Sequence, residues 1–276
     1  MASLFLVTGG NGFVGRQIIK ALNVKGYKIR AVIRRGGRNA PHLKSTNVTT
    51  IESNDVFQEN ESWWREALSG VDYVIHAAWY VNPMDYLTSK KNIDSLISTL
   101  TIAKISAELN VKKFVGIGTC FEYKQSNQDL SFRSPLEPVT LYASTKVAAY
   151  NVLIHLFENT KTNFLWCRLF YLYGEGEKKE RLVPYIVRNL IANKNVELTS
   201  AEEIKDYMDV EDAAREIVKA TISKRTGPIN ICTGIGISVY DLAISLAKKV
   251  NKSHLIKIGK KDKKNTNPKR VVGIKN

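Results

Sequence analysis

The sequence predicts an α/β fold, a doubly wound parallel sheet with a smaller C-terminal lobe. Short apolar runs alternate with helical periodicity along most of the 276 residues, and a glycine-rich turn follows the first run. Such alternation is typical of parallel strands joined by helices that cover both faces of the sheet, with ligands at the carboxyl edge. Strands are expected at residues 4–7, 28–33, 48–51, 72–77, 113–118, 163–169 and 229–232.

The first predicted strand runs directly into a turn with glycines spaced three apart. Glycines at this spacing permit a turn that a Cβ would obstruct, let the backbone approach a pyrophosphate and let the following helix pack against its strand. The N–H groups that open the helix then face the phosphates. We therefore predict a Rossmann-like dinucleotide site rather than glycines that serve only a tight turn. Its expected contacts are Gly9, Asn11, Gly12, Phe13, Val14 and Gly15.

The second predicted strand ends in Arg34 and Arg35, where a protein that binds NAD is expected to carry a carboxylate for the adenosine ribose. No Asp or Glu precedes Glu52. Two guanidinium groups can instead clamp a 2′-phosphate. The sequence therefore favours NADP, bound as NADPH, over NAD; the alternative is that both arginines only decorate a surface loop.

The fourth predicted strand ends in His76, Ala77 and Ala78. The small alanines let the chain pass close beneath a cofactor, so both are cofactor-binding candidates. His76 lies in an apolar run and is interpreted as a core histidine rather than a catalytic base. A long helix expected over 85–109 carries Asn92, which is either a residue of the helix face or part of a buried polar relay.

The fifth predicted strand delivers the Thr119 hydroxyl to the ligand edge, and Tyr142 and Lys146 open a later helix. Residues four apart share a helix face, so the ammonium is expected beside the phenol. A nearby cation favours phenolate and lowers the tyrosine pKa, as a general acid/base requires. Tyr86 and Lys90 have the same spacing but precede that strand, so we predict that Thr119, Tyr142 and Lys146 are the catalytic residues.

The net charge of +15 lies partly in the basic run 257–264, which has no aromatic residue. Nucleic-acid grooves usually interleave aromatics with cations, so we expect a solvated face and no nucleic-acid partner. No stretch reaches the ~20 apolar residues that span a bilayer, so no membrane partner is expected. The three separated cysteines lack metal-ligand spacing, and the apolar N-terminus is already used as a strand. These features predict reduced thiols, no metal site and a cytoplasmic location.

These motifs resemble those of the extended short-chain dehydrogenase/reductases, in the branch of nucleotide-sugar epimerases, dehydratases and reductases. The resemblance is carried by the glycine turn, Thr119, residues 142–146, Asn92 and the runs 168–174, 205–212 and 229–234. It implies that Tyr142 is the acid/base, that Lys146 lowers its pKa and holds the nicotinamide ribose, and that Thr119 hydrogen-bonds the reacting oxygen. Tyr171 is a further cofactor-binding candidate.

The resemblance also implies how the chain is divided. Residues 1–174, joined by the strand near 229–232, would bind NAD(P), and residues 175–276 would mainly form a substrate-binding lobe. Arg181 and Lys205 are candidates for the diphosphate of a nucleotide-sugar, and Cys120 and Phe121 are further substrate-binding candidates. A homodimer is expected through the helices near 85–109 and 142–159.

The reaction type is predicted from departures from the family pattern. The 4,6-dehydratases carry Asp-Glu directly after the threonine, where this chain has Cys120 and Phe121, and Glu122 is interpreted as a carboxylate on the rim. Epimerase-reductases of the fucose-synthase kind carry cysteine at the position of Phe121. We therefore expect an NADPH-dependent reductase that moves hydride to C4 of a nucleoside-diphosphate 4-keto-6-deoxyhexose. The alternatives are a 4-epimerase or dehydratase, and a non-catalytic NADP-binding sensor or scaffold.

Overall fold

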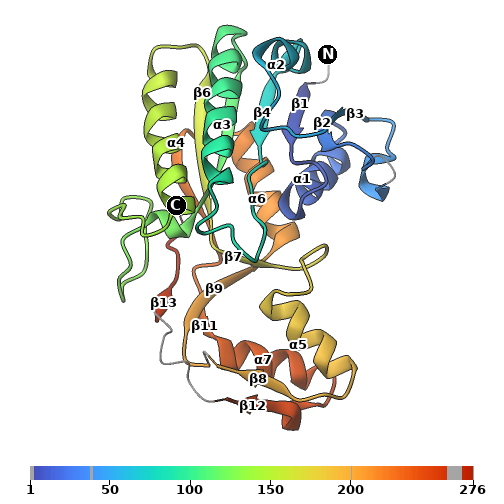
Figure 1. The fold of residues 1–276 in the computed structure, drawn as a ribbon, viewed down its shortest axis with the longest axis vertical. Helices are drawn as coiled ribbons and strands as arrows, with labels where there is room; N and C mark the ends of the chain where they lie inside the picture. Colours follow the sequence, from blue (N-terminus) through green and yellow to red (C-terminus); the bar gives the residue numbers. More distant parts are fainter. Residues whose placement is uncertain (1–2, 38–39, 200, 260–268, 276) are drawn as a thin grey trace.

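The computed structural model describes residues 3–37, 40–199, 201–259 and 269–275. Its centre is a seven-stranded parallel sheet in the order β10-β6-β5-β4-β1-β2-β3 (Figure 1), which confirms the predicted doubly wound class. Each strand expected from the sequence is present, with ends shifted by two residues at most. They are β1 (Leu4–Thr8), β2 (Lys28–Arg34), β3 (Val48–Ser53), β4 (Tyr73–His76), β5 (Lys113–Thr119), β6 (Asn163–Leu169) and β10 (Gly227–Ile231).

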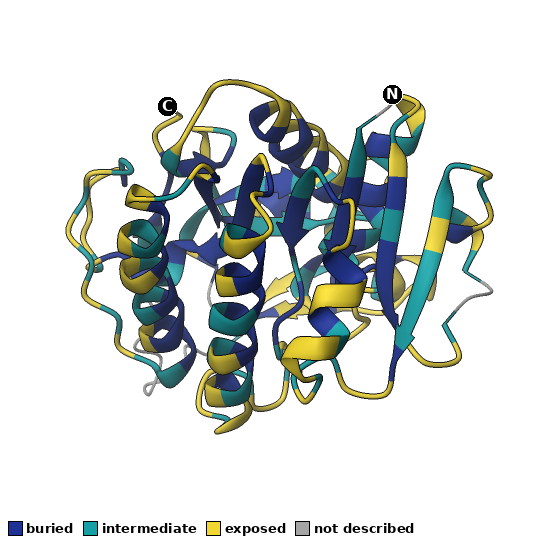
Figure 2. Cartoon of the chain, turned by 90° about the horizontal axis from the view of Figure 1, so that it is seen from above, coloured by how far each residue is buried: buried dark blue, intermediate teal, exposed yellow. Residues whose placement is uncertain are grey.

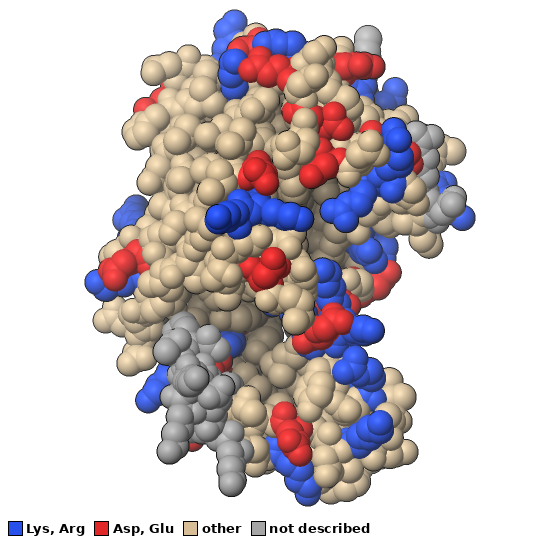
Figure 3. Space-filling view, viewed as in Figure 1, with Lys and Arg blue, Asp and Glu red and all other residues tan. Residues whose placement is uncertain are grey.

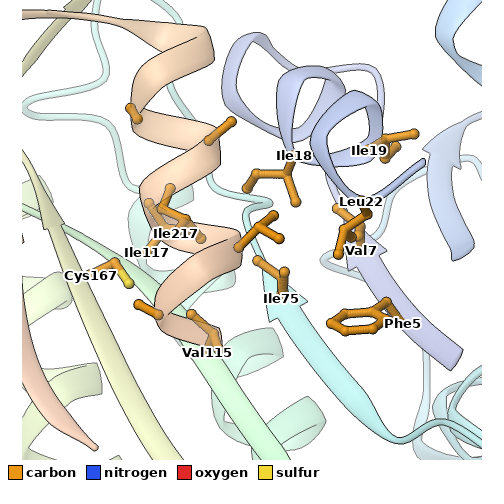
Figure 4. Packing of buried hydrophobic residues seen from close by; sticks show 14 of the residues in the cluster. Phe5, Val7, Ile18, Ile19, Leu22, Ile75, Val115, Ile117, Cys167 and Ile217 are labelled. Carbon is orange, nitrogen blue, oxygen red and sulfur yellow. The ribbon is translucent and has the colours of Figure 1, made fainter. Parts of the chain in front are cut away.

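Helices cover both faces of this sheet because each buries one apolar stripe and leaves the other side to water, as Figure 2 shows. One face carries α1 (Phe13–Val24) and α6 (Val210–Ile222). Figure 4 shows Ile18 of α1 and Ile217 of α6 packing over Ile75 and Val115 of the sheet. The other face carries α2 (Glu61–Leu68), α3 (Lys91–Glu108) and α4 (Leu141–Glu158).

The long helix α3 begins at Lys91, so the expected start at residue 85 is wrong. The preceding residues form turns instead, in which Asn82 O accepts from the N–H of Tyr86 (2.9 Å). The Asn92 side-chain amide then donates to the carbonyls of Tyr86 (2.6 Å) and Ser89 (2.9 Å). Bonds of this kind give the backbone an alternative to the helical ladder, and they leave Tyr86 outside the helix.

The C-terminal lobe has a small core of its own, made by α5 (Leu182–Ile191), α7 (Val239–Lys248) and the paired strands β8 (Val196–Leu198) and β12 (Ile256–Ile258). A second sheet joins it to the rest of the chain (Figure 1). That sheet contains β7 (Tyr171–Tyr173), β9 (Ile204–Asp209), β11 (Gly236–Ser238) and β13 (Arg270–Val271). After residue 175 both α6 and β10 return to the large sheet. The chain therefore passes between the large sheet and the C-terminal lobe more than once.

Basic and acidic side chains are interspersed over the face drawn in Figure 3. Residues 260–264 of the basic run at 257–264 lie outside the described residues, so the expectation of a solvated face there is not examined by the structure. Among the described residues, no helix has the length and apolarity to cross a membrane, and no group of three His, Cys, Asp or Glu residues is placed to hold a metal.

Candidate active site

The glycine turn joins β1 to α1, and its glycines Gly9 and Gly15 leave no room for a side chain. A Cβ on Gly15 would lie 2.2 Å from the carbonyl oxygen of Gly9, and one on Gly9 would lie 3.0 Å from Ala78 N. Gly9 also has a φ of +68°, in the left-handed region that favours glycine. The first turn of α1 carries no acidic residue and no side-chain cap. Its N–H groups are therefore open to an anion, as the sequence predicts.

Asn11 lies between the glycine turn and the loop that follows β2. Its side-chain amide packs against Gly37, and its Oδ1 is buried without a hydrogen-bond partner in the described part of the chain. Next to it, the Arg16 guanidinium donates to the carbonyls of Asn11 (3.1 Å) and Gly12 (3.3 Å). The sequence analysis missed this cation. Its signal is a basic residue directly after the third glycine.

Arg34 and Arg35 lie at the carboxyl end of β2, beside the glycine turn. Both are exposed, and neither guanidinium has an ion-pair or hydrogen-bond partner within the residues that the structure describes. Glu52 lies on β3 in register with Ile33, one residue before the level of Arg34. The end of β2 itself therefore presents two cations and no carboxylate.

His76 is a core histidine, which confirms that interpretation. It is buried, with Thr8 Oγ1 2.9 Å from Nδ1 and Thr99 Oγ1 2.9 Å from Nε2. Burial lowers its pKa to about 3, so the ring is neutral. Thr8 Oγ1 also accepts from Ala78 N (3.0 Å), and this network sets Ala77 and Ala78 against Gly9.

Thr119 and Tyr142 meet at the carboxyl edge of the sheet. Thr119 is the last residue of β5, and Tyr142 stands in the first turn of α4, which Thr140 caps by accepting from Ala143 N (3.2 Å). Thr119 lies close enough to Tyr142 for its side chain to lower the pKa of the phenol, and the Tyr86 ring packs edge-on against Tyr142 with centroids 5.1 Å apart. The structure thus brings the predicted hydroxyl pair together.

The expected effect of Lys146 on Tyr142 is not present in the structure. Burial raises the pKa of Tyr142 above its ordinary value, and the hydrogen bond from Thr119 opposes that rise. The Lys146 ammonium lies 6.0 Å from the Tyr142 ring centroid and donates to the carbonyl of Ile117 at 2.6 Å. Burial lowers the pKa of Lys146 to about 7. Burial is thus the largest cause of the pKa shift of each group.

A tryptophan that the sequence analysis missed holds Lys146. The ammonium lies 3.6 Å from the Trp79 ring centroid, a close cation–π contact, and the indole N–H donates to Asn92 Oδ1 at 2.9 Å. Asn92 is fully buried, and its amide also donates to two carbonyls of the turn before α3. Of the two interpretations left open, the buried polar one is therefore confirmed. The signal for Trp79 is an aromatic residue directly after the paired alanines.

The predicted substrate-binding residues gather around an aromatic cluster. Tyr171 lies between Phe121 (centroids 6.1 Å apart) and Tyr207 (5.7 Å). The Lys205 ammonium lies 4.8 Å from the Tyr171 ring centroid and pairs with Glu203 at 2.5 Å. Tyr171 is predicted as a cofactor contact. Its contacts within the described residues are instead with Phe121, Lys205 and Tyr207, and not with the glycine turn.

Two further predicted substrate contacts differ in exposure. Arg181 is exposed and lies with its guanidinium 5.3 Å from the Tyr86 ring centroid, so it approaches Tyr142 from the lobe. Cys120 packs into a hydrophobic cluster with Tyr123 and Phe170 and presents almost no surface. Burial raises its thiol pKa to about 12.

The interpretation of Glu122 as a rim carboxylate is wrong. Its side chain is fully buried, and Arg168 Nε donates to Oε2 at 2.6 Å. The backbone N–H of Thr119 donates to Oε1 at 2.8 Å. An arginine 46 residues away along the chain keeps this carboxylate inside, and such a partner is not evident from local sequence.

Comparisons with known proteins identify the family of the chain. Residues 5–232 match the NAD dependent epimerase/dehydratase family. The chain is 24% identical over 236 residues to dTDP-6-deoxy-L-talose 4-dehydrogenase (NAD(+)) of Aggregatibacter actinomycetemcomitans, which covers 83% of this chain and 84% of that protein. It is 27% identical over 252 residues to GDP-6-deoxy-D-talose 4-dehydrogenase of the same organism, with 86% and 76% covered.

A solved structure shows the same fold. It is the UDP-glucose 4-epimerase of Thermotoga maritima, determined with UDP-glucose, which superposes with a TM-score of 0.85 at 19% identity. The match covers 99% of this chain and 90% of that chain. From the family match, the strand order and the glycine turn together, the chain belongs to the NAD dependent epimerase/dehydratase family.

Proposed function

We propose that this protein is an NADPH-dependent reductase that transfers hydride to the C4 carbonyl of a nucleoside-diphosphate 4-keto-6-deoxyhexose, with the proton supplied by Tyr142. The observation that carries the proposal is the hydroxyl pair of Thr119 and Tyr142 at the sheet edge that also holds the glycine turn. Two relatives are named as 4-dehydrogenases of nucleotide-linked 6-deoxytalose. The reverse of such a reaction reduces a 4-keto-6-deoxy sugar.

The residues at the glycine turn fit a dinucleotide. Gly9 and Gly15 leave a bare backbone, and the buried Oδ1 of Asn11 has no donor within the described residues. When bound, the nicotinamide supplies the hydride. Arg34 and Arg35 would hold the 2′-phosphate of NADPH. The preference for NADPH over NADH rests on these two arginines alone, since one relative is named for NAD(+).

The proton step follows from the surroundings of Tyr142. Because burial raises its pKa, the phenol keeps its proton until the carbonyl oxygen gains negative charge. Thr119 would orient that oxygen by a hydrogen bond. The Lys146 ammonium lies 6.0 Å from the Tyr142 ring centroid, and from there it would stabilise the phenolate that remains. Arg181 and Lys205 would contact the diphosphate from the lobe.

A dehydratase needs an acid for the leaving hydroxyl and a base for the C5 proton. Here Cys120 is buried with a raised pKa, Phe121 is apolar, and Glu122 is held by Arg168. We therefore expect no 4-keto-6-deoxy product when a plain nucleotide-hexose is incubated with NADP+, as read by mass spectrometry. A product lighter by one water would overturn the choice of reductase. The control is an incubation of the 4-keto-6-deoxy sugar with NADPH, in which NADPH should be consumed.

We also propose that two copies associate through α3 and α4, as the resemblance implies. Ile93 and Ile97 of α3 and Val152 of α4 are exposed apolar side chains on neighbouring helices. A second copy of the chain would remove them from water.

A further inference from the structure

Glu122 lies where three elements of the fold meet. It follows β5 in the single turn η2 (Cys120–Glu122), and its carboxylate accepts from the indole N–H of Trp166 on β6, with both oxygens 3.1 Å from Nε1. That indole lies across β5, where a Cβ on Gly116 or Gly118 would come within 2.3 Å of it. The two glycines of β5 therefore leave space for the indole beside Glu122.

Arg168 is as firmly held as Glu122. The guanidinium lies between the rings of Tyr123 and Tyr150, 5.0 and 4.7 Å from their centroids. Its Nη1 donates to the Tyr123 hydroxyl and to the carbonyl of Phe132, both at 3.4 Å. With side chains 1% and 0% exposed, Arg168 and Glu122 form an ion pair without access to solvent.

A buried ion pair is weak evidence of stabilisation, because desolvation offsets the attraction between the charges. The contacts of this pair point to another role. Glu122 Oε1 accepts the backbone N–H of Thr119, while Thr119 Oγ1 accepts from Phe121 N at 3.3 Å. These reciprocal bonds form a capping box that fixes the backbone and side chain of Thr119 together. Thr119 is thereby held beside Tyr142, whose pKa its side chain lowers.

We propose that Glu122 and Arg168 are positioning residues, which hold the Thr119 hydroxyl in the geometry that proton transfer from Tyr142 requires. This inference rests on the proposed reductase function. Glu122 is fully buried and accepts from the backbone N–H of Thr119, so its effect on the reaction would pass through Thr119. Reaction rates are sensitive to such geometry, since a misplacement of about 1 Å can cost about 100-fold in rate.

The test is a double-mutant cycle on kcat for reduction of a nucleoside-diphosphate 4-keto-6-deoxyhexose. Glu122→Gln should lower kcat by about tenfold or more, with KM and the Kd for NADPH changed less than about twofold. In a Thr119→Ala background the same substitution should change kcat by less than about twofold. An equal loss in both backgrounds, or an unchanged kcat in the single variant, would overturn the proposal.

Lys113→Met is the matched control. Lys113 is buried at the opposite end of β5, where its ammonium donates to the carbonyls of Ser223 (2.6 Å) and Arg225 (3.0 Å). Its loss should lower Tm and leave kcat unchanged. If Glu122→Gln does not fold, Glu122→Gln with Arg168→Met removes both charges and should fold with the same loss of kcat. If the parent protein reduces no keto-sugar, both the proposed function and this inference are wrong. If the parent is active, the kcat of the variants tests the positioning role by itself.

Discussion

Tyr142→Phe is expected to lower kcat at least about 100-fold, which is the loss typical of removing a general acid. The substitution deletes one hydroxyl and keeps the ring that packs against Tyr86, so the fold should persist. Cofactor affinity should remain near that of the parent, because the phenol is not expected to hold the dinucleotide. Steady-state kinetics together with calorimetric NADPH binding would check both parts.

The control for that variant is Tyr86→Phe, which alters the tyrosine of the other Tyr-x-x-x-Lys run. Tyr86 lies in the turns before α3, and its ring packs on Tyr142 and Arg181. Phenylalanine preserves this packing, so kcat should change little. Full activity in Tyr142→Phe would contradict the assignment of Tyr142 as the proton donor.

The double substitution of Arg34 and Arg35 by alanine is expected to erase most of the preference for NADPH over NADH. Charge-assisted hydrogen bonds contribute about 1.5–3 kcal/mol each, so the loss of two corresponds to about 10²- to 10⁴-fold in the Kd for NADPH. The Kd for NADH should change little, because NADH has no 2′-phosphate. Fluorescence titration with each cofactor measures the ratio directly.

Lys248→Ala with Lys249→Ala controls for net charge, since it removes two exposed cations at the end of α7, away from β2. It should leave both Kd values unchanged. Equal Kd values for NADPH and NADH in the parent protein would show that the arginines do not select the cofactor.

The sheet and the hydroxyl pair could be predicted because their signals are local. Apolar runs define the strands, and parallel topology brings strand ends such as Thr119 to a common edge. The start of α3 could not be predicted from periodicity, because side-chain bonds of Asn92 hold the preceding turn. The sequence likewise shows Tyr142 and Lys146 four residues apart, but it does not show that Trp79 draws the ammonium aside.

Burial changes the chemistry that spacing alone suggests. Glu122 lies three residues after Thr119, and the sequence alone suggests a carboxylate at the rim of the site. In the structure its carboxylate is buried, because it pairs with Arg168 and accepts from Trp166, both on β6. The pKa of Tyr142 rises although a lysine lies one turn away, because burial removes the phenol from water and the ammonium lies 6.0 Å from the ring centroid. Tertiary contacts of this kind carry no signature in local sequence.

Isotope transfer tests the proposed reaction most directly. NADPH that carries deuterium at both C4 positions of the nicotinamide would be incubated with a nucleoside-diphosphate 4-keto-6-deoxyhexose and analysed by NMR and mass spectrometry. We predict stoichiometric loss of NADPH and one deuterium at C4 of a 6-deoxyhexose, and in D₂O no solvent label at C3 or C5. Unconsumed NADPH, or a product without deuterium at C4, would contradict the assignment of this protein as a 4-keto reductase.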